Sequence, residues 1–351
     1  MICEAQPRLR LARLPTPLEE APRLSETLGV NLLIKREDLA GLCVGGNKAR
    51  LLEYALGSLR AEGVDALIAY AAAQSNKLRD IAAAAARCGM RAVLLIPGGS
   101  AMKDGAPLQG NRLLFDILGA DVRVVAPDLD AAAIMAAQVA VRDELAGEGW
   151  RAAILDRRLE YGVDAAIAYV DAAEELHEQA TALGKPPHFV FIAAGAGMTA
   201  AGLALGLKHL GSPARVVGVC ISSSTADLTP EIERHAARAA ERLGIRTRLD
   251  ACDFTLIDRY AATGYGALTP ALVEAMRRFA RLHGMVIDPV YNAKVALALG
   301  DWTAEGVRRG ATIVYVNTGG GPAIYDYNEA ICAVPDSRDE AARHGGGTAA
   351  R

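Results

Sequence analysis

Short apolar segments alternate with helical segments along most of the chain. Runs rich in Val, Ile and Leu predict strands over residues 31–35, 66–70, 91–97, 121–127, 152–156, 190–194, 215–221 and 312–317. Apolar residues at helical spacing predict helices just after residue 48 and over residues 75–88, 162–183, 199–209 and 270–283. Mostly apolar strands separated by helices are typical of parallel sheets covered on both faces. The pattern therefore predicts an α/β fold.

Length and composition favour a globular protein of two domains. The chain has 351 residues, of which 52% are hydrophobic and 23% are charged. A net charge of −3 without a basic tract argues against nucleic-acid binding. No apolar run has the length of a membrane span, so we expect no membrane association. The polar, glycine-rich stretch 336–351 is expected to be a flexible tail.

The cysteines and histidines make a disulfide framework or a metal site improbable. Six cysteines are scattered without a CxxC pair, and the N-terminal stretch lacks the apolar core of a signal peptide. Reduced thiols and a cytoplasmic location are the natural expectation. The six histidines show neither HExxH nor paired spacing, so we predict no metal site.

A lysine stands at the start of the helix that follows "VGGNKAR", residues 44–50. The positive end of the helix dipole and desolvation between domains both favour the neutral amine of Lys48. A neutral amine attacks carbonyl groups and can form a Schiff base. The two preceding glycines permit tight turns or the close approach of a flat cofactor. Taken alone, a lysine near a helix start is usually an ordinary surface residue.

A second motif is a strand, a glycine-rich loop and a helix within residues 190–207. Such a loop directs backbone N–H groups and a helix N-terminus at an anion, usually a phosphate. The loop also fits a loose dinucleotide fingerprint, but no acidic residue ends the next strand at 219–225, and no Walker A lysine follows. The pattern favours a site for a single phosphate group, with an ordinary glycine turn as the alternative.

A Schiff-base lysine and one phosphate site together indicate pyridoxal 5′-phosphate (PLP). The motifs "KRED", "GGNK", "QSN", "GAGMTAAGL", "GYG", "DPVY" and "NTGGG" occur in this order over most of the chain. In this the sequence resembles the fold-type-II PLP enzymes that include D-cysteine desulfhydrase and 1-aminocyclopropane-1-carboxylate (ACC) deaminase. The resemblance implies two three-layer α/β/α domains with mostly parallel sheets.

The resemblance assigns the cofactor-binding residues. Lys48 would hold PLP covalently and move protons at the substrate Cα, and Asn47 would bind the 3-oxygen of the cofactor. Thr318 matches the family position that meets the pyridine nitrogen, and Asn292 is included among the cofactor-binding residues. The phosphate would be held by the loop of Gly195, Ala196, Gly197, Met198 and Thr199.

The resemblance also assigns substrate-binding and catalytic residues. Gln74, Ser75, Asn76 and Lys77 open a helix whose free N–H groups suit an α-carboxylate. Ser75 would lie beside the substrate as a base or nucleophile. Tyr265 and Tyr291 match family tyrosines that face the substrate. Without the family, Ser75 and Asn76 are explained as a helix cap and the tyrosines as core aromatics with polar tips.

Two departures from the desulfhydrases bear on the substrate. Lys77 replaces the histidine of their "QSNH", and "LDRRLEYG" at 155–162 replaces a glycine-rich turn. With Lys77, Arg157 and Arg158 in the substrate-binding set, together with Tyr161, we predict a polar or anionic substrate such as cysteate. The alternative is that these cations form structural ion pairs with Asp156 and Glu160.

The reaction follows from the group expected at the pyridine nitrogen. A hydroxyl there, unlike a carboxylate, favours rapid loss of a good β leaving group. ACC deaminases read DPVYE and carry a leucine before the final glycines, where this chain has Asn292 and Thr318. We therefore predict a β-elimination lyase or deaminase that releases ammonia and a 2-oxo acid. ACC deamination, β-replacement, racemisation and PLP binding without turnover remain alternatives.

The domain boundaries complete the prediction. Residues 1–53 and 162–335 are expected to form a large PLP-anchoring domain, and residues 54–161 a small substrate-side domain. The active site would lie in the cleft between the two domains. The family resemblance implies a homodimer that acts on a small amino acid.

Overall fold

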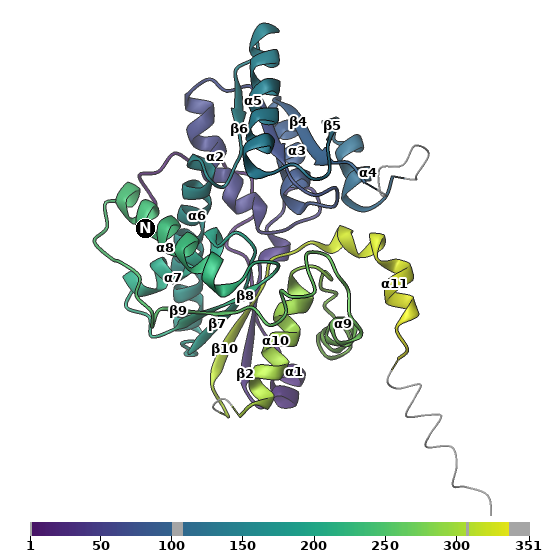
Figure 1. The fold of residues 1–351 in the computed structure, drawn as a ribbon. Helices are drawn as coiled ribbons and strands as arrows, with labels where there is room; N and C mark the ends of the chain where they lie inside the picture. The colour runs from purple at the N-terminus through teal and green to yellow at the C-terminus, as the bar shows by residue number, and fades with distance from the viewer. Residues whose placement is uncertain (1, 100–107, 307–308, 337–351) are drawn as a thin grey trace, which may run out of the picture.

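The structure is a computed structural model that describes residues 2–99, 108–306 and 309–336 (Figure 1). Its strands are β1 (Leu18–Glu20), β2 (Asn31–Arg36), β3 (Ala66–Tyr70), β4 (Arg91–Pro97), β5 (Asp121–Val125), β6 (Ala152–Ile154), β7 (Phe189–Ala194), β8 (Arg215–Cys220), β9 (Phe254–Ile257) and β10 (Thr312–Asn317). Its α-helices are α1 (Pro22–Leu28), α2 (Lys48–Ala61), α3 (Asn76–Cys88), α4 (Gly110–Ile117), α5 (Ala131–Gly147), α6 (Glu160–Ala182), α7 (Met198–His209), α8 (Thr225–Leu243), α9 (Pro270–His283), α10 (Asn292–Ala304) and α11 (Asn328–Ala333).

The strands form two separate sheets. The larger sheet has the order β1-β2-β10-β7-β8-β9, and all its neighbouring strands are parallel except β1, which runs antiparallel to β2. The smaller sheet has the order β5-β4-β3-β6 and is parallel throughout. Figure 1 shows the smaller sheet in the upper part of the view and the larger sheet in the lower part. The predicted α/β fold with two mostly parallel sheets is confirmed.

Helices cover both faces of the larger sheet because its central strands are apolar on both sides. In β7, Val190 and Ile192 pack into the core that contains α6 and α7, while Phe191 and Ala193 pack into the core that contains α9 and α10. Successive side chains of a strand point to opposite faces, so such a run needs apolar cover on each.

The smaller sheet follows the same rule. Leu67 and Ala69 of β3 face the core shared with α3, whereas Ala66 and Ile68 pack against apolar side chains of α5. The first of these cores is continuous with the one beneath α6 and α7. One hydrophobic core therefore joins the helices of both sheets.

The sequence pattern located the main elements but missed others. All eight predicted strands occur, although β6 ends at Ile154 and β5 at Val125. The short edge strands β1 and β9 were not predicted. Ser75, expected as the first residue of a helix, is instead the N-cap of α3. Within the described ranges no helix combines the length and the hydropathy that a bilayer crossing needs.

The positions of the two sheets support a division of the chain. All strands of the smaller sheet lie between residues 66 and 154, and all strands of the larger sheet lie outside that range. We therefore propose the predicted domains, with the qualification that both boundaries fall within or beside continuous helices, α2 and α6. The predicted tail lies outside the described residues except for Asp336, which forms an ion pair with Arg281.

Candidate active site

A cavity of about 360 Å³ lies where the carboxyl ends of strands from both sheets meet. The segments that follow β3, β7, β8 and β10 line it, together with the first residues of α2, α3 and α7. Ligands of open α/β sheets bind in the crevice at the carboxyl ends of the strands. The topology therefore places this cavity where a binding site is expected.

The loop before α2 fixes the position of Lys48 at the cavity wall. The backbone N–H of Asn47 donates to the carbonyl of Thr318 at 3.0 Å, so the loop is attached to the segment that follows β10. Gly45 has a φ of 84°, and a methyl group there would lie 2.0 Å from the carbonyl oxygen of Asp38. Only glycine fits this position.

A hydrogen bond fixes the amine of Lys48 at the cavity. Lys48 Nζ donates to Asn47 Oδ1 at 2.9 Å, and Asn47 Nδ2 donates to the hydroxyl of Tyr169 at 2.9 Å. Burial lowers the pKa of Lys48 to about 8, and the carboxylate of Asp80 opposes this effect. At pH 7 about a tenth of this amine is neutral, far more than for an ordinary lysine, and the neutral form is the one that attacks carbonyl groups.

The predicted phosphate loop connects β7 with α7, and all of residues 195–199 line the cavity. Gly197 adopts a φ of 80°, and a methyl group on it would lie 2.9 Å from Cγ1 of Ile232. Among the described residues no side chain caps the N-terminus of α7, whose N-cap is Gly197. Its first N–H groups therefore remain available for an anion, whose charge the helix dipole also favours.

Thr318 and Asn292 belong to one hydrogen-bonded network, but only Thr318 lines the cavity. Asn292 Oδ1 accepts from the backbone N–H of Thr318 at 3.0 Å and from its hydroxyl at 3.4 Å. Asn292 Nδ2 in turn donates to Asp288 Oδ1 and to the carbonyl of Gly319. Asn292, predicted to bind the cofactor, instead stands behind Thr318 and holds it in place.

The segment 74–77 is divided between the cavity and a supporting network. Ser75 and Lys77 line the cavity. The side chains of Gln74 and Asn76 instead bind Asn111 of α4, so they are directed at the neighbouring helix. Ser75 Oγ accepts from the N–H of Leu78 and thereby caps α3, as the alternative interpretation of the motif predicted.

Tyr265 and Tyr291 come together on one side of the cavity. Their hydroxyl oxygens are 3.0 Å apart, and their rings meet edge to face at 78°. Burial raises the pKa of Tyr291 well above its ordinary value, and the neighbouring Tyr265 adds to this effect. Burial also raises the pKa of Tyr265. Both hydroxyls therefore stay protonated at neutral pH and can donate a proton or a hydrogen bond.

The turn at 155–162 does not bring its predicted residues to this cavity. Arg158 makes two hydrogen bonds to Asp156, at 2.8 and 2.9 Å, and is exposed. Tyr161 is buried and, with Arg158, lines a different hollow, next to α8. Arg157 is exposed and is near enough to Lys77 to lower the pKa of that amine. In this structure Asp156 engages the guanidinium of Arg158, and substrate binding by Arg158 stays a prediction.

Sequence reasoning missed several residues of the site. Ser222 lines the cavity and directly follows the predicted strand 215–221, so its place at a carboxyl end was a usable signal. Tyr169 of α6 and Arg79 of α3 bind the loop of Lys48 directly, and Asp80 binds Arg79. Their roles depend on contacts between distant segments, which spacing along the chain does not reveal.

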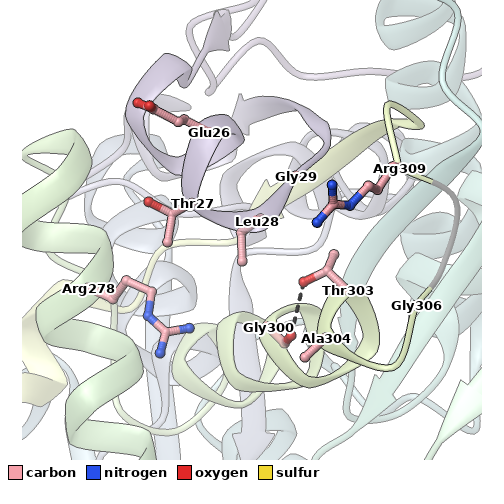
Figure 2. A pocket seen from close by; sticks show the side chains of 10 residues that line it. All are labelled: Glu26, Thr27, Leu28, Gly29, Arg278, Gly300, Thr303, Ala304, Gly306 and Arg309. Atoms are coloured by element: carbon pink, nitrogen blue, oxygen red, sulfur yellow. Dashed lines mark hydrogen bonds between the residues drawn. The ribbon is translucent and has the colours of Figure 1, made fainter.

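Other hollows and clusters lack this combination of groups. A hollow of about 540 Å³ lies between α1 and α10, with Arg278 and Arg309 on its rim (Figure 2). No predicted site residue lines it. Asp250, Cys252 and Asp253 bring possible metal ligands together, but Lys208 Nζ binds both carboxylates at 2.7 and 2.8 Å. We assign no function to either feature.

The residues of the main cavity fit PLP. An amine with a lowered pKa, a glycine loop with free N–H groups, and a hydroxyl at Thr318 surround one space of suitable size. These are the partners that an aldehyde, a phosphate and a ring nitrogen need. Fold and site together define a PLP-dependent enzyme of fold type II.

Comparison with known proteins identifies the family. The model of the family described as pyridoxal-phosphate dependent enzyme matches residues 9–319, and the chain belongs to this family. D-cysteine desulfhydrase of Klebsiella pneumoniae (strain 342) is 36% identical over 329 residues, which cover 92% of this chain and 96% of that protein. D-cysteine desulfhydrase of Salmonella choleraesuis (strain SC-B67) is 35% identical over 327 residues, with the same two coverages.

A solved structure leads to the same family. The crystal structure of an ACC deaminase homologue superposes with a TM-score of 0.85 at 30% identity and covers 95% of this chain and 98% of its own. The predicted cofactor, PLP, and the predicted class, a PLP-dependent lyase of the D-cysteine desulfhydrase family, are confirmed.

Proposed function

We propose that the protein eliminates a β substituent from a small, polar amino acid and releases ammonia and a 2-oxo acid. The observation that carries this proposal is the hydroxyl of Thr318, which Asn292 holds at the cavity in place of a carboxylate. A hydroxyl opposite a ring nitrogen does not keep that nitrogen protonated, so loss of a β leaving group is favoured over slower chemistry. The names of the D-cysteine desulfhydrases support the same reaction.

Each of these residues of the cavity has a separate role in the proposed reaction. Bound PLP withdraws electrons from the substrate Cα. Lys48 takes the proton from Cα, because its amine reaches the cavity and is readily neutral. The N-terminus of α3, capped by Ser75, binds the α-carboxylate. Tyr291, whose hydroxyl is hydrogen-bonded to that of Tyr265, donates to the departing β group.

Lys77 supplies the preference for a polar or anionic β substituent. It lines the cavity, and its Nζ donates to the carbonyl of Tyr70 at 3.0 Å. Burial lowers its pKa to about 8, while Asp156 opposes this change. At neutral pH the amine still carries its charge for most of the time. It can therefore pair with a sulfonate or carboxylate of the substrate.

A substrate panel tests the proposal. D- and L-cysteine, cysteate, chloroalanine, diaminopropionate, serine and ACC are assayed for ammonia and 2-oxo acid. We expect turnover of the β-substituted amino acids and little of ACC. Lys77→Met should raise KM for cysteate about tenfold or more and leave KM for chloroalanine nearly unchanged, because a charge-assisted hydrogen bond is lost. Arg142→Ala, at an exposed position where Arg142 pairs with Asp143, serves as the control and should change neither value.

ACC deamination is the second candidate, because the ACC deaminase homologue matches nearly the whole fold. ACC turnover faster than that of every β-substituted amino acid would overturn the leading proposal in its favour. We also retain two proposals: the homodimer, from the family resemblance, and the cytoplasmic location, from the scattered cysteines. Light scattering on the purified protein tests the first, and cell fractionation tests the second.

A further inference from the structure

Asp80 is a buried carboxyl group to which the reaction described above assigns no role. It lies in the second turn of α3, and none of its surface is exposed. Its Oδ1 accepts from Arg79 Nε at 2.9 Å. Its Oδ2 is shut off from solvent and has no hydrogen-bond partner among the described residues. A buried carboxylate oxygen without a partner is costly, so its retention needs a reason.

The free oxygen lies against the loop that carries Lys48. A methyl group placed on Gly46 would lie 3.7 Å from Asp80 Oδ2 and 3.2 Å from Arg79 Nη2. Arg79 Nη2 also donates to the carbonyl of Gly45 at 2.8 Å. The Arg79–Asp80 pair thus attaches α3, which carries Ser75 and Lys77, to the residues directly before Lys48.

The charges around Lys48 come from two elements. Asp80, Arg79 and Lys77 lie on α3, and Asp288 lies before α10. Burial has the largest effect and lowers the pKa of Lys48. Among the charges, Asp80 has the strongest effect and raises it, while Arg79 and Lys77 lower it. The negative charge of Asp80, with a smaller contribution from Asp288, thus offsets the two neighbouring cations.

The groups around Asp80 in turn change its pKa. Burial raises the pKa of Asp80 to about 6, whereas Arg79 and Lys48 lower it. The buried hydroxyl of Tyr161 also has no hydrogen-bond partner in the part of the chain that the structure describes. Burial together with the charge of Asp80 raises its pKa. Asp80 is therefore anionic at neutral pH, and its charge acts on the amine of Lys48 and on the hydroxyl of Tyr161.

We propose that Asp80 is a positioning residue that acts as the counter-ion of Lys48 whenever that amine is free of cofactor and protonated. This inference rests on the proposed role of Lys48 in taking the Cα proton. A buried ammonium next to Arg79 and Lys77 would otherwise be strongly disfavoured. Asp80 Oδ2 can accept a hydrogen bond from this ammonium, directly or through an enclosed water.

The test follows the attachment of PLP to the full-length chain after its own cofactor has been removed. Attachment needs the neutral amine, so its rate plotted against pH reports the pKa of Lys48. In Asp80→Asn, which preserves the shape and the acceptor for Arg79, the midpoint should fall by about one pH unit. Attachment at pH 7 should then be several-fold faster than in the wild type. A purely structural role would instead slow attachment at every pH.

Controls separate the charge of Asp80 from its packing. Tyr161→Phe removes the other unsatisfied group without changing a charge, so its midpoint should equal that of the wild type. An unchanged midpoint in folded Asp80→Asn overturns the proposal. If that variant does not fold, carboxyl NMR replaces it: Lys48→Met should raise the pKa of Asp80, since coupling is reciprocal. An unchanged pKa of Asp80 also overturns the proposal.

These outcomes are independent of the proposed reaction. Substrate turnover enters neither measurement, so a failed substrate panel leaves the shift in midpoint intact. Conversely, if the wild type shows elimination activity but Asp80→Asn leaves the midpoint of PLP attachment unchanged, only the proposal for Asp80 is overturned.

Discussion

Asn292 Oδ1 accepts two hydrogen bonds from Thr318, one from its backbone N–H at 3.0 Å and one from its hydroxyl at 3.4 Å. The amide nitrogen of Asn292 binds Asp288 and Gly319 at the same time. Every polar atom of this buried amide side chain is therefore engaged. The hydroxyl of Thr318 is held at the cavity by a side chain that does not itself reach the cavity.

Asn292→Ala should destabilise the protein. The substitution leaves Asp288 Oδ1 and the backbone of Thr318 with fewer partners inside the core, at a cost of about 2–4 kcal/mol in the free energy of unfolding. Urea unfolding of the cofactor-free protein measures this loss. Asn328→Ala, at an exposed position, is the control and should cost less than about 0.5 kcal/mol. Equal stability of the two variants would contradict the network.

The tyrosine pair should act as a hydroxyl donor. Tyr291→Phe is expected to lower kcat about 100-fold while the absorbance of the bound cofactor is preserved, because only proton donation to the leaving group is lost. Tyr265→Phe should lower kcat less, since its hydroxyl acts through that of Tyr291 at 3.0 Å. The double variant should resemble Tyr291→Phe. If the losses of kcat in the two single variants add up in the double variant, the hydroxyl of Tyr265 does not act through that of Tyr291.

The loop before Lys48 should tolerate no side chain at Gly45. Gly45→Ala places a methyl group 2.0 Å from the carbonyl of Asp38 and should abolish PLP binding. Gly29→Ala is the matched control: its φ is also positive, at 69°, but no atom lies within 4 Å of the new methyl group. It should cost about 1–2 kcal/mol of stability and leave cofactor absorbance unchanged. Normal cofactor binding by Gly45→Ala would show that the loop is not rigid.

The covalent attachment of PLP should depend on pH through Lys48. Its pKa is about 8 in the folded protein, below its ordinary value because the amine is buried. Below pH 8 the neutral fraction falls about tenfold per pH unit, so the attachment rate should fall with it and level off above pH 8. Stopped-flow absorbance measures this rate. A midpoint near pH 10 would mean that the amine is exposed to water.

Periodicity and local motifs were sufficient for the parts of the fold that depend on neighbouring residues. The apolar runs of β7 and β10 are buried on both faces, so they predicted central parallel strands. The edge strand β1 has only three residues and is stabilised by pairing with β2, a contact that its own sequence does not indicate.

The same distinction holds for the site. Lys48 and the glycine loop have the local spacing that their chemistry requires, so the sequence predicted them. The sequence did not reveal where the side chains of Asn292 and Arg158 point, because their partners, Thr318 and Asp156, decide this. Asp80 was missed because its importance lies in its proximity to a loop more than thirty residues earlier in the chain.

Borohydride reduction of the PLP-loaded protein, followed by peptide mass spectrometry, tests the central assignment most directly. Reduction should fix the cofactor on the peptide that contains Lys48 and abolish the visible absorbance band, and Lys48→Ala should show neither the band nor the adduct. A stable adduct on another lysine, such as Lys77 in the same cavity, or a protein that stays colourless with PLP, would contradict this account.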